Sequence, residues 1–402
     1  MKIAIVASDY IPTIGGVQTA VRHIARHLQR LGHPVIILSS LPPGDIPVRE
    51  QVDGTWVNRF PWGCRPLGSL PLRATGTLVG MARALRAFQP DLVYVHFLSI
   101  NALYVLLLHH LMRFRFVASA RCNDIQGIPL RSGLQRWMLT RLFARADAAI
   151  FCSGFVQRDA APYLERVSPR AYVGVVGDGF DPDEFCDPNL AKVVNLRIAK
   201  HPVGKEQYQT IQPSNYPTIQ LSNYQTYILA MGRLVHKKGF DLLIRAFAHL
   251  ASEFPQVQLL IAGDGEERAA LERLIDELNL RERVILLGFT DRATSLALFW
   301  GCEFFVLSSR LEPFGIVVAE AMAAHKAVLA TRSGGVVDLV QPGTNGLLVD
   351  ADVGALAQGM RELLAHPDAT RALGKRAAQT IQTRTWAAVT EQYVRVFQQV
   401  TR

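Results

Sequence analysis

Cysteine is scarce in this sequence and shows no pattern. The five cysteines among 402 residues are odd in number and widely scattered, and no CxxC or Cys/His spacing occurs. Disulfide scaffolds and structural zinc sites both need closely patterned cysteines. We therefore expect reduced, mostly buried thiols and no metal bound through them.

Long apolar runs are also missing. The longest, INALYVLLLHHLM at 100–112, contains an asparagine and two histidines. It is shorter than the roughly 18–20 apolar residues that a transmembrane helix needs. The first residues, MKIAIVASDY, enter a strand pattern with no basic leader or cleavage site. The expectation is a cytoplasmic protein.

Acidic residues are sparse in the first half of the chain. Residues 1–185 hold 20 Lys and Arg against 13 Asp and Glu, a surplus of +7, so the remainder supplies only +2 of the net charge of +9. A basic half suits anionic partners such as phosphorylated substrates or the anionic lipids at the inner face of a membrane. The arginines are dispersed, as on solvated helix faces, so we do not expect nucleic acid to be a partner.

Strand-like and helix-like segments alternate along the chain. KIAIVAS at 2–8 is an apolar strand pattern, residues 17–31 place apolar side chains at helical spacing, and PVIILSS at 34–40 is the next strand. Further strand patterns recur at 91–97, 114–120, 147–153, 171–177, 226–232, 257–263, 283–289 and 304–309. This order predicts an α/β fold of two doubly wound, Rossmann-like domains with parallel sheets. Ligands bind beyond the carboxyl ends of such strands, and we expect both edges to face one interdomain cleft.

An internal repeat separates the two halves. YQTIQPSN (208–215) is followed by YPTIQLSN (216–223), and a third copy begins with YQT. A period this short is not that of a solenoid, and we interpret the tract as an expanded linker. The expected domains are therefore 1–185 and 226–385, with 186–225 as the linker.

A loop with two cations follows the strand pattern at 226–232. In GRLVHKKGF (232–240), Arg233 and Lys238 lie on either side of a turn that opens a helix. An arginine fork, a lysine and a helix N-terminus together suit a diphosphate. The GxxxxGK[ST] of a Walker A loop is absent. Two solvated loop cations are the alternative interpretation.

The next loop, IAGDGEE at 261–267, contains two glycines but lacks the third glycine of a GxGxxG fingerprint. Glu266 and Glu267 at a helix N-terminus would repel phosphate. We assign this loop to packing, or to contact with a ribose or base.

The segment RLEPFGIVVAEAMA (310–323) places Glu312 before a Pro-Gly turn and Glu320 eight positions later in a helix pattern. Backbone N–H groups near Gly315 and Ile316 would point at an anion. A helical step of this length is about 12 Å, longer than the roughly 5–9.5 Å between the carboxyl groups of glycoside hydrolases. Carboxylates that bind hydroxyls on either side of a phosphate fit better, and glutamates without a functional role are the alternative.

These motifs together resemble glycosyltransferase family 4, whose members are retaining, nucleotide-sugar-dependent enzymes with the GT-B fold. The likeness extends over nearly the whole chain except the octapeptide tract. It rests above all on Glu312 and Glu320, spaced E-x7-E after SSRxEPFG. The other matching motifs are Gly15-Gly16 after the first strand, GRLVHKKG, GDGEE, LGF and SGGVVDLVQPGTNGLLV at 333–349.

The resemblance implies catalytic roles for three residues. Arg233 and Lys238 would neutralise the donor diphosphate, and Glu312 would contact hydroxyls of the donor sugar. Stabilising a departing diphosphate needs positive groups where charge develops. No cofactor and no metal are implied.

The resemblance also implies a donor-binding set. Glu320 would bind the nucleotide ribose, while Phe289 and Thr290 would lie against the base. Gly16 would let the first loop approach the phosphates. Backbone amides that face the donor would come from Phe314, Gly315 and Ile316. The C-terminal helix, 386–402, would pack back on the first domain.

The chain departs from the family at one loop. Many relatives have a histidine after the strand at 114–120, where this chain has SARCNDIQG (119–127), so Arg121 and the candidate cleft residues Asn123 and Asp124 stand there instead. His96 matches another common family position and is a further candidate cleft residue, although a lone histidine at a strand end is more often structural. DPD at 181–183 formally matches the DxD metal signature of a different transferase fold, and we interpret it as a turn.

The combined expectation is a retaining, metal-independent glycosyltransferase of polysaccharide biosynthesis. It would move a sugar from a nucleotide diphosphate donor to a hydroxyl of a glycan or lipid-linked glycan, with peripheral membrane contact through the basic first domain. NRFPWGCRPLGSLPLR (58–73) would either meet that acceptor or cover the core. The alternatives are a GT-B epimerase or phosphorylase, and a catalytically silent or partner-dependent sugar-nucleotide-binding protein.

Overall fold

The structure, a computed structural model, describes residues 1–13, 15–62, 70–126, 132–168, 171–186, 196–197, 218–219 and 226–402. The chain divides into two compact units, one made of Met1–Gly179 with Trp386–Arg402 and the other of Phe180–Thr385. The division lies between Gly179 and Phe180, whereas the sequence pattern placed it after residue 185. Most of the octapeptide tract and the centre of the 58–73 segment, with Cys64, lie outside the described residues.

The first unit is built on an eight-stranded sheet with the order β3-β4-β2-β1-β5-β6-β7-β8. Neighbouring strands pair in parallel, except that β3 and β4 form an antiparallel pair, which the sequence pattern did not predict. The central strands β1, β5, β6 and β7 are buried at every position, as expected for strands covered on both faces. The strands are β1 (Ile3–Ala7), β2 (Val35–Ser40), β3 (Arg49–Val52), β4 (Thr55–Phe60), β5 (Leu92–His96), β6 (Phe116–Ala120), β7 (Ala148–Phe151) and β8 (Tyr172–Val175).

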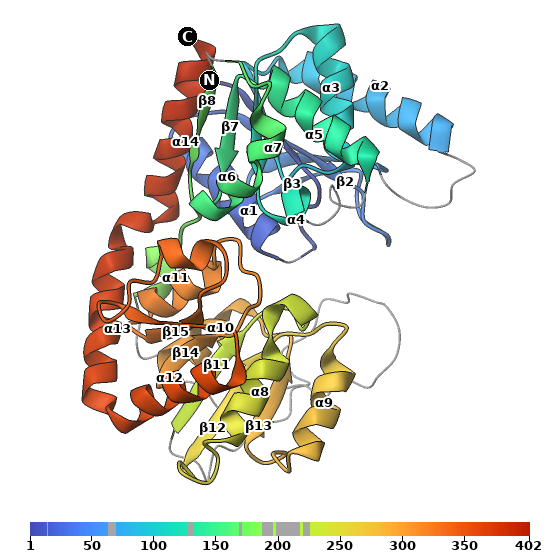
Figure 1. Ribbon diagram of the computed structural model, residues 1–402. Helices are drawn as coiled ribbons and strands as arrows, with labels where there is room; N and C mark the ends of the chain where they lie inside the picture. Colours follow the sequence, from blue (N-terminus) through green and yellow to red (C-terminus); the bar gives the residue numbers. More distant parts are fainter. Residues whose placement is uncertain are drawn as a thin grey trace. The chain divides into compact units, whose positions relative to one another are not determined.

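Helices cover both faces of this sheet (Figure 1). α2 (Leu70–Phe88), α3 (Ile100–Met112) and α5 (Gly133–Arg145) connect strands that follow one another from β4 towards β7, and right-handed crossovers place all three on one face. α1 (Gly16–Arg30) connects β1 to β2 in the opposite direction and lies on the other face.

The C-terminal helix α14 (Trp386–Thr401) packs beside α1. The rings of His23 and Trp386 stack with their centroids 5.2 Å apart. Three short helices complete the first unit: α4 (Asn123–Gln126), α6 (Gly154–Asp159) and α7 (Ala161–Leu164).

The second unit is built on a six-stranded parallel sheet with the order β13-β12-β11-β14-β15-β16. Its strands are β11 (Thr226–Met231), β12 (Val257–Ala262), β13 (Val284–Gly288), β14 (Phe304–Leu307), β15 (Ala327–Thr331) and β16 (Gly346–Val349). The direction of the strand order reverses between β11 and β14. Loops at such a switch point are where a doubly wound sheet binds its ligand.

The second unit has helices of both kinds. The α-helices are α8 (Phe240–Ala248), α9 (Arg268–Glu277), α10 (Arg292–Gly301), α11 (Ile316–Ala323), α12 (Val353–Ala365) and α13 (Pro367–Ile381). The 3-10 helices are η2 (Pro182–Phe185), η5 (His236–Lys238), η6 (Gly335–Asp338) and η7 (Gln382–Arg384). The two-residue strands β9 (Leu196–Arg197) and β10 (Thr218–Ile219) pair antiparallel.

The predicted α/β class, with two mainly parallel sheets, is confirmed. Ile228, Leu259 and Leu329 from the second sheet pack with Phe240 and Phe247 of α8 in one buried apolar cluster. Within the described ranges, no helix is both long and apolar enough to cross a membrane.

Candidate active site

The loops that follow β11 and β14 approach each other closely at the switch point of the second sheet. Gly239 has a left-handed backbone with φ of 64°, and a Cβ there would stand 2.1 Å from the carbonyl oxygen of Ser308. The Ser308 hydroxyl donates to the carbonyl of Lys238 at 3.0 Å, and the N–H of Arg310 donates to that of Lys237 at 2.8 Å. Only glycine permits this approach, which holds Lys238 beside the β14 loop.

Arg310 strengthens the junction between these two loops. Its two terminal nitrogens each lie 2.7 Å from an oxygen of Asp241, and one also donates to the His236 carbonyl at 2.9 Å. Burial alone would raise the pKa of Asp241, but the hydrogen bonds and charge of Arg310 outweigh it and lower that pKa. The sequence pattern did not identify this pair, because the partners are 69 positions apart.

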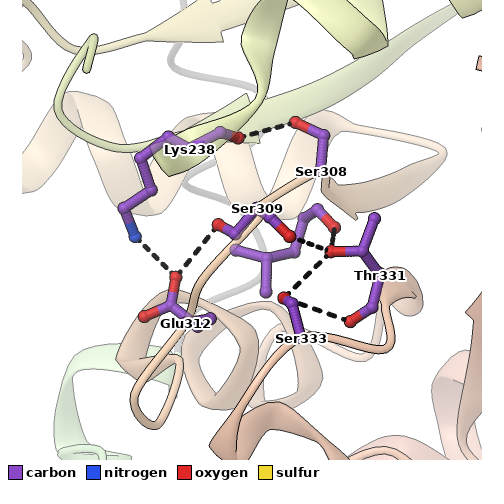
Figure 2. A network of polar contacts seen from close by, with 7 residues as sticks. Lys238, Ser308, Ser309, Glu312, Thr331 and Ser333 are labelled. Atoms are coloured by element: carbon purple, nitrogen blue, oxygen red, sulfur yellow. Dashed lines mark hydrogen bonds and ion pairs between the residues drawn. The ribbon is translucent and has the colours of Figure 1, made fainter. Parts of the chain in front are cut away.

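Lys238 and Glu312 form an ion pair at this junction (Figure 2). The distance from Lys238 Nζ to Glu312 Oε2 is 2.5 Å, and the Ser309 hydroxyl donates to the same oxygen at 3.2 Å. The side chain of Glu312 is buried. Two of the residues predicted from the sequence therefore stand in direct contact.

The backbone of Glu312 is fixed by the loop that follows β15. Its N–H donates to the Ser333 carbonyl at 3.3 Å, and its carbonyl accepts from the N–H of Gly335 at 2.8 Å. Figure 2 shows the hydroxyl of Thr331 beside the same loop, 2.5 Å from the Ser309 carbonyl oxygen and 3.1 Å from the Ser333 hydroxyl. These buried contacts define the position of the glutamate, and none of the three hydroxyl residues was predicted.

Helix α11 begins at Ile316, four residues after Glu312, and has no side-chain cap. Its N-cap residue, Gly315, is left-handed with φ of 96°, and the preceding Phe314 is buried. The first N–H groups of such a helix, from Ile316 onward, point outward along the axis and favour an anion. The turn thus sets a partial positive charge next to the Lys238–Glu312 pair.

Glu320 lies further along α11, and it is buried. Arg292 Nη1 donates to its Oε1 at 2.6 Å, and the same guanidinium pairs with Glu184 on η2. Burial raises the pKa of Glu320, while the charge and hydrogen bond of Arg292 act in the opposite direction. The sequence pattern did not identify Arg292, since Glu184 is 108 positions away and no local motif marks the pair.

Arg233 and Phe289 are both exposed. In the part of the chain that the structure describes, the Arg233 side chain has no hydrogen bond or ion pair. The hydroxyl of Thr290, next to Phe289, lies 2.8 Å from that of Ser295. The exposed cation and the exposed ring both remain accessible to a ligand.

The GDGEE loop packs against the loop that carries Arg233. A Cβ at Gly263 would stand 1.9 Å from the Gly232 carbonyl oxygen, and one at Gly265 would stand 2.4 Å from that of Leu234. The N–H of Gly263 also donates to the Gly288 carbonyl at 2.8 Å. The packing that was one of the two expected roles of this loop is thus observed, and contact with a ribose or base stays a prediction.

Two family models match the chain, and together they span most of it. The model described as Glycosyltransferase Family 4 matches residues 14–184, and the one described as Glycosyl transferases group 1 matches residues 217–380. The chain belongs to glycosyltransferase family 4. It is a glycosyltransferase, as the motifs implied.

Similar proteins extend over nearly the full length of this glycosyltransferase. A GDP-mannose-dependent alpha-mannosyltransferase of Mycolicibacterium smegmatis is 29% identical over 98% of this chain and 96% of its own. An uncharacterized glycosyltransferase of Methanocaldococcus jannaschii is also 29% identical, over 87% of this chain and 85% of its own.

Solved structures show that the fold is of the GT-B type. The sucrose-phosphate synthase of Thermosynechococcus elongatus superposes with a TM-score of 0.80 at 21% identity, over 99% of this chain and 98% of that one. HepE of Anabaena, in complex with UDP and glucose, superposes with a TM-score of 0.77 at 20% identity, over 99% of both chains.

The remaining predicted residues of this glycosyltransferase belong to the first unit. Gly16 is exposed and begins α1, which has no side-chain cap. His96 is fully buried at the end of β5, with its Nδ1 2.8 Å from the Tyr94 hydroxyl, and burial lowers its pKa. Asn123 is half-buried and begins α4.

Asp124 is buried and holds backbone groups together. Its carboxylate accepts the N–H groups of Leu98, Arg121 and Cys122, at 2.7–3.0 Å. Burial raises its pKa, and these hydrogen bonds act against the rise. Asp124 therefore stabilises the conformation of the loop that follows β6.

Arg121, in the loop after β6, forms a buried ion pair with Asp178. Its other terminal nitrogen lies 3.4 Å from the hydroxyl of Tyr393 on α14. Burial raises the pKa of Asp178, and Arg121 opposes that rise. The guanidinium thus links β6, the segment before Gly179 and the C-terminal helix.

The DPD sequence forms a capping turn. The Asp181 side chain accepts the N–H of Asp183 at 3.2 Å and so caps η2. Among the residues that the structure describes, no group of three or more His, Cys, Asp or Glu side chains is placed to hold a metal ion.

Proposed function

We propose that this enzyme transfers a sugar from a nucleoside diphosphate donor, with retention of the anomeric configuration, to a hydroxyl of a glycan or lipid-linked glycan. The observation that carries the proposal is the Lys238–Glu312 ion pair beside the uncapped start of α11, with Glu320 buried further along that helix. The junction of the loops after β11 and β14 thereby offers a cation, N–H donors and two carboxylates.

The donor diphosphate would bind to Arg233, Lys238 and the first N–H groups of α11. In the structure, the Glu312 carboxylate neutralises the charge of Lys238. A bound diphosphate would take over that role and leave the Glu312 carboxylate to accept hydroxyls of the donor sugar. The exchange keeps a buried carboxylate supplied with partners in both states, which limits the desolvation cost.

The chemical step makes the diphosphate more negative. The bond between the anomeric carbon and the phosphate oxygen breaks, and its electron pair passes to the diphosphate. The acceptor oxygen forms the new bond on the same face of the sugar, and its hydroxyl proton passes to the departing diphosphate. Arg233, Lys238 and the helix N–H groups stand where that charge develops. Removing one such group typically costs about 2.7–4 kcal/mol of barrier. The proposal requires no metal ion.

The nucleoside would be held by Glu320 and by the Phe289–Thr290 loop. Arg292 occupies only Oε1 of Glu320, so the second carboxylate oxygen can accept the ribose hydroxyls. The exposed ring of Phe289 offers a stacking surface for the base. A GDP-mannose-dependent relative and a structural neighbour bound to UDP support a nucleotide donor of this kind.

The acceptor would reach the enzyme through the basic first unit. Its surplus of arginine and lysine suits an anionic or lipid-linked glycan at a membrane surface, where peripheral contact would bring enzyme and acceptor together.

A product assay tests the proposal. UDP-, GDP- and ADP-sugars are supplied with membrane and glycan extracts as acceptors, with and without EDTA, beside an Arg233→Ala/Lys238→Ala variant. The expected result is nucleotide release that EDTA does not affect and that the double variant loses. Anomeric analysis of the product reports retention. Tight binding of a nucleotide sugar without any release would overturn the proposal in favour of a silent or partner-dependent protein.

A further inference from the structure

One layer of helices in the first unit has no acidic residue. The sequences of α2, α3 and α5 contain six arginines and not one Asp or Glu. Between Asp53 and Asp147 the chain has only two acidic residues, Asp91 and Asp124. Asp124 is buried, and Asp91 accepts the N–H of Lys2 ahead of β5. Neither of them belongs to these helices.

Helix α3 exposes apolar side chains. It is mostly apolar, with His110 as an exposed polar side chain, and three large apolar residues point to solvent: Ile100, Leu107 (45% exposed) and Leu111 (68% exposed). Their spacing of seven and four residues places them on one stripe of the helix. A helix of this composition is normally covered by neighbouring elements. The exposed stripe therefore indicates a surface that binds a partner.

The neighbouring helix α5 combines apolar and basic side chains on its exposed side. Leu134 is 67% exposed and Trp137 is 51% exposed. Arg136 and Arg141 are exposed beside them, and the Arg141 guanidinium lies 5.9 Å from the centre of the Trp137 ring.

On the other side of α3, helix α2 adds the exposed Val79, Arg83 and Arg86. The exposed sides of the three helices form one continuous surface. All three cover the same face of the sheet, α2 packs against α3, and α3 packs against α5 (Figure 1). Side chains that are exposed on such a layer point away from the sheet. We call this the α2–α3–α5 surface.

We propose that the α2–α3–α5 surface binds the headgroup region of an anionic lipid bilayer. Exposed leucines can enter the boundary between headgroups and acyl chains. Tryptophan favours that same boundary. Arginines near an anionic surface each add roughly fivefold to the affinity. This inference rests on the proposed function, and it names the residues that would make the membrane contact proposed there.

Two rival occupants fit the charge less well. A second copy of this chain, joined by a two-fold contact, would set the arginines of one surface against those of the other. A folded protein partner would have to supply a matching acidic rim around an apolar centre. A bilayer supplies a plane of negative charge directly above an apolar layer, which matches both features at once.

Helix α1 provides an internal control. It also lacks acidic residues, but its exposed charged side chains, Arg22, Arg26 and Arg30, have no exposed apolar neighbours within the helix. Substituting two of these arginines changes the net charge of the first unit as much as substituting two on α5. The pair of variants separates a specific surface from a general effect of net charge.

The experiment is flotation of the full-length protein with vesicles of phosphatidylcholine alone, or with phosphatidylglycerol as roughly a third of the lipid. The variants are Leu107→Ser/Leu111→Ser and Arg136→Glu/Arg141→Glu. Their controls are Val48→Ser/Val337→Ser, at exposed valines elsewhere, and Arg26→Glu/Arg30→Glu. Far-UV circular dichroism and thermal melting confirm that each variant is folded.

We expect the wild type to float only with the anionic vesicles. Both α2–α3–α5 variants should lower the vesicle-bound fraction by more than about tenfold, with binding in the control pairs close to wild type. Failure of the wild type to bind, or binding that survives both surface variants, would overturn the proposal. So would a dimer in solution that Leu107→Ser/Leu111→Ser dissociates, without vesicle binding. The assay uses no donor and no turnover, so its failure leaves the transferase proposal intact.

Discussion

The two units of this glycosyltransferase repeat one architecture but distribute charge differently. In the second unit, α8, α9, α11, α12 and α13 each contain an acidic residue. Cations in the segments that follow the strands form ion pairs with acidic residues, such as Lys238–Glu312 and Arg292–Glu320. In the first unit, α1, α2, α3 and α5 have no acidic residue at all. Its one fully buried ion pair in the described residues, Arg121–Asp178, lies in the core.

The difference shows that the same parallel sheet can use charge for two purposes. In the proposed mechanism, the pairs at the strand ends of the second unit are exchangeable, because the donor would replace one partner. The Arg121–Asp178 pair is not exchangeable, since both groups are buried and Tyr393 lies against them. Substitutions in the two units should therefore separate stability from activity.

The largest effect is expected for Arg121→Met in the first unit. It leaves Asp178 as a buried charge without its partner, which typically costs about 3–5 kcal/mol of unfolding free energy. Urea denaturation measures the loss. Arg121→Met/Asp178→Leu removes both charges and should recover much of it. A double variant no more stable than the single one would show that the pair does not account for the loss. The Kd for a nucleotide sugar should stay close to wild type in both.

Arg233→Ala should produce the opposite result in the second unit. We expect kcat to fall by about 10²–10³-fold because one group that stabilises the departing diphosphate is lost. Thermal stability should not change, since the side chain is exposed. Nucleotide release and thermal melting are measured in parallel, with Arg281→Ala as an exposed arginine control. A loss of less than about threefold would remove Arg233 from the proposed mechanism.

Gly239→Ala tests the approach of the two loops that places Lys238. The added Cβ would meet the Ser308 carbonyl oxygen at 2.1 Å, in a left-handed backbone. The matched control is Gly343→Ala, which is also left-handed but has nothing within 4 Å. The difference in unfolding free energy isolates the steric contact, and we expect about 1–3 kcal/mol. Equal losses at the two glycines would mean that the loops are not in close contact.

The smallest effect concerns pH. Burial already raises the pKa of Glu320, and Arg292 opposes that rise. In Arg292→Gln the pKa should rise further, so Glu320 takes up a proton at higher pH and loses the charge that favours the ribose hydroxyls. The KM for the donor should then begin to increase, as pH falls, at a higher pH than in wild type.

The measurement is KM and kcat for the donor between roughly pH 5 and pH 8. Arg292→Lys keeps the positive charge and should restore most of the wild-type profile. If KM depended on pH in the same way in wild type and Arg292→Gln, Arg292 would not be the group that keeps Glu320 ionised.

Local patterns in the sequence predicted the repeated strands and the loops at their ends. β11, β12 and β14 lie where apolar runs placed them, because strands of a covered parallel sheet are apolar throughout. The pairing between loops was not predictable: Lys238 and Glu312 were both named, but 74 positions separate them. Only the tertiary fold brings such partners together.

Some residues of the site and one strand could not be predicted from local sequence patterns, and the reasons are physical. Arg292 and Arg310 belong to no motif of their own, and their partners Glu184 and Asp241 lie far away in the sequence. The carboxylate of Asp124, a candidate cleft residue, accepts hydrogen bonds from backbone N–H groups. A sequence pattern does not reveal such contacts. The short edge strand β3 escaped prediction because its residues, REQV, are mostly polar.

The first unit is assembled from the beginning and the end of the chain, with the whole second unit inserted between Gly179 and Trp386. A ribosome therefore synthesises every residue of the second unit before it begins α14. Until then, the α1 face next to Trp386 stays uncovered and Arg121 lacks Tyr393. The second unit can fold early, but the first unit is completed only when the last helix has been synthesised. A nascent chain stalled ahead of residue 386 would thus be recognisable to chaperones by an exposed α1 face.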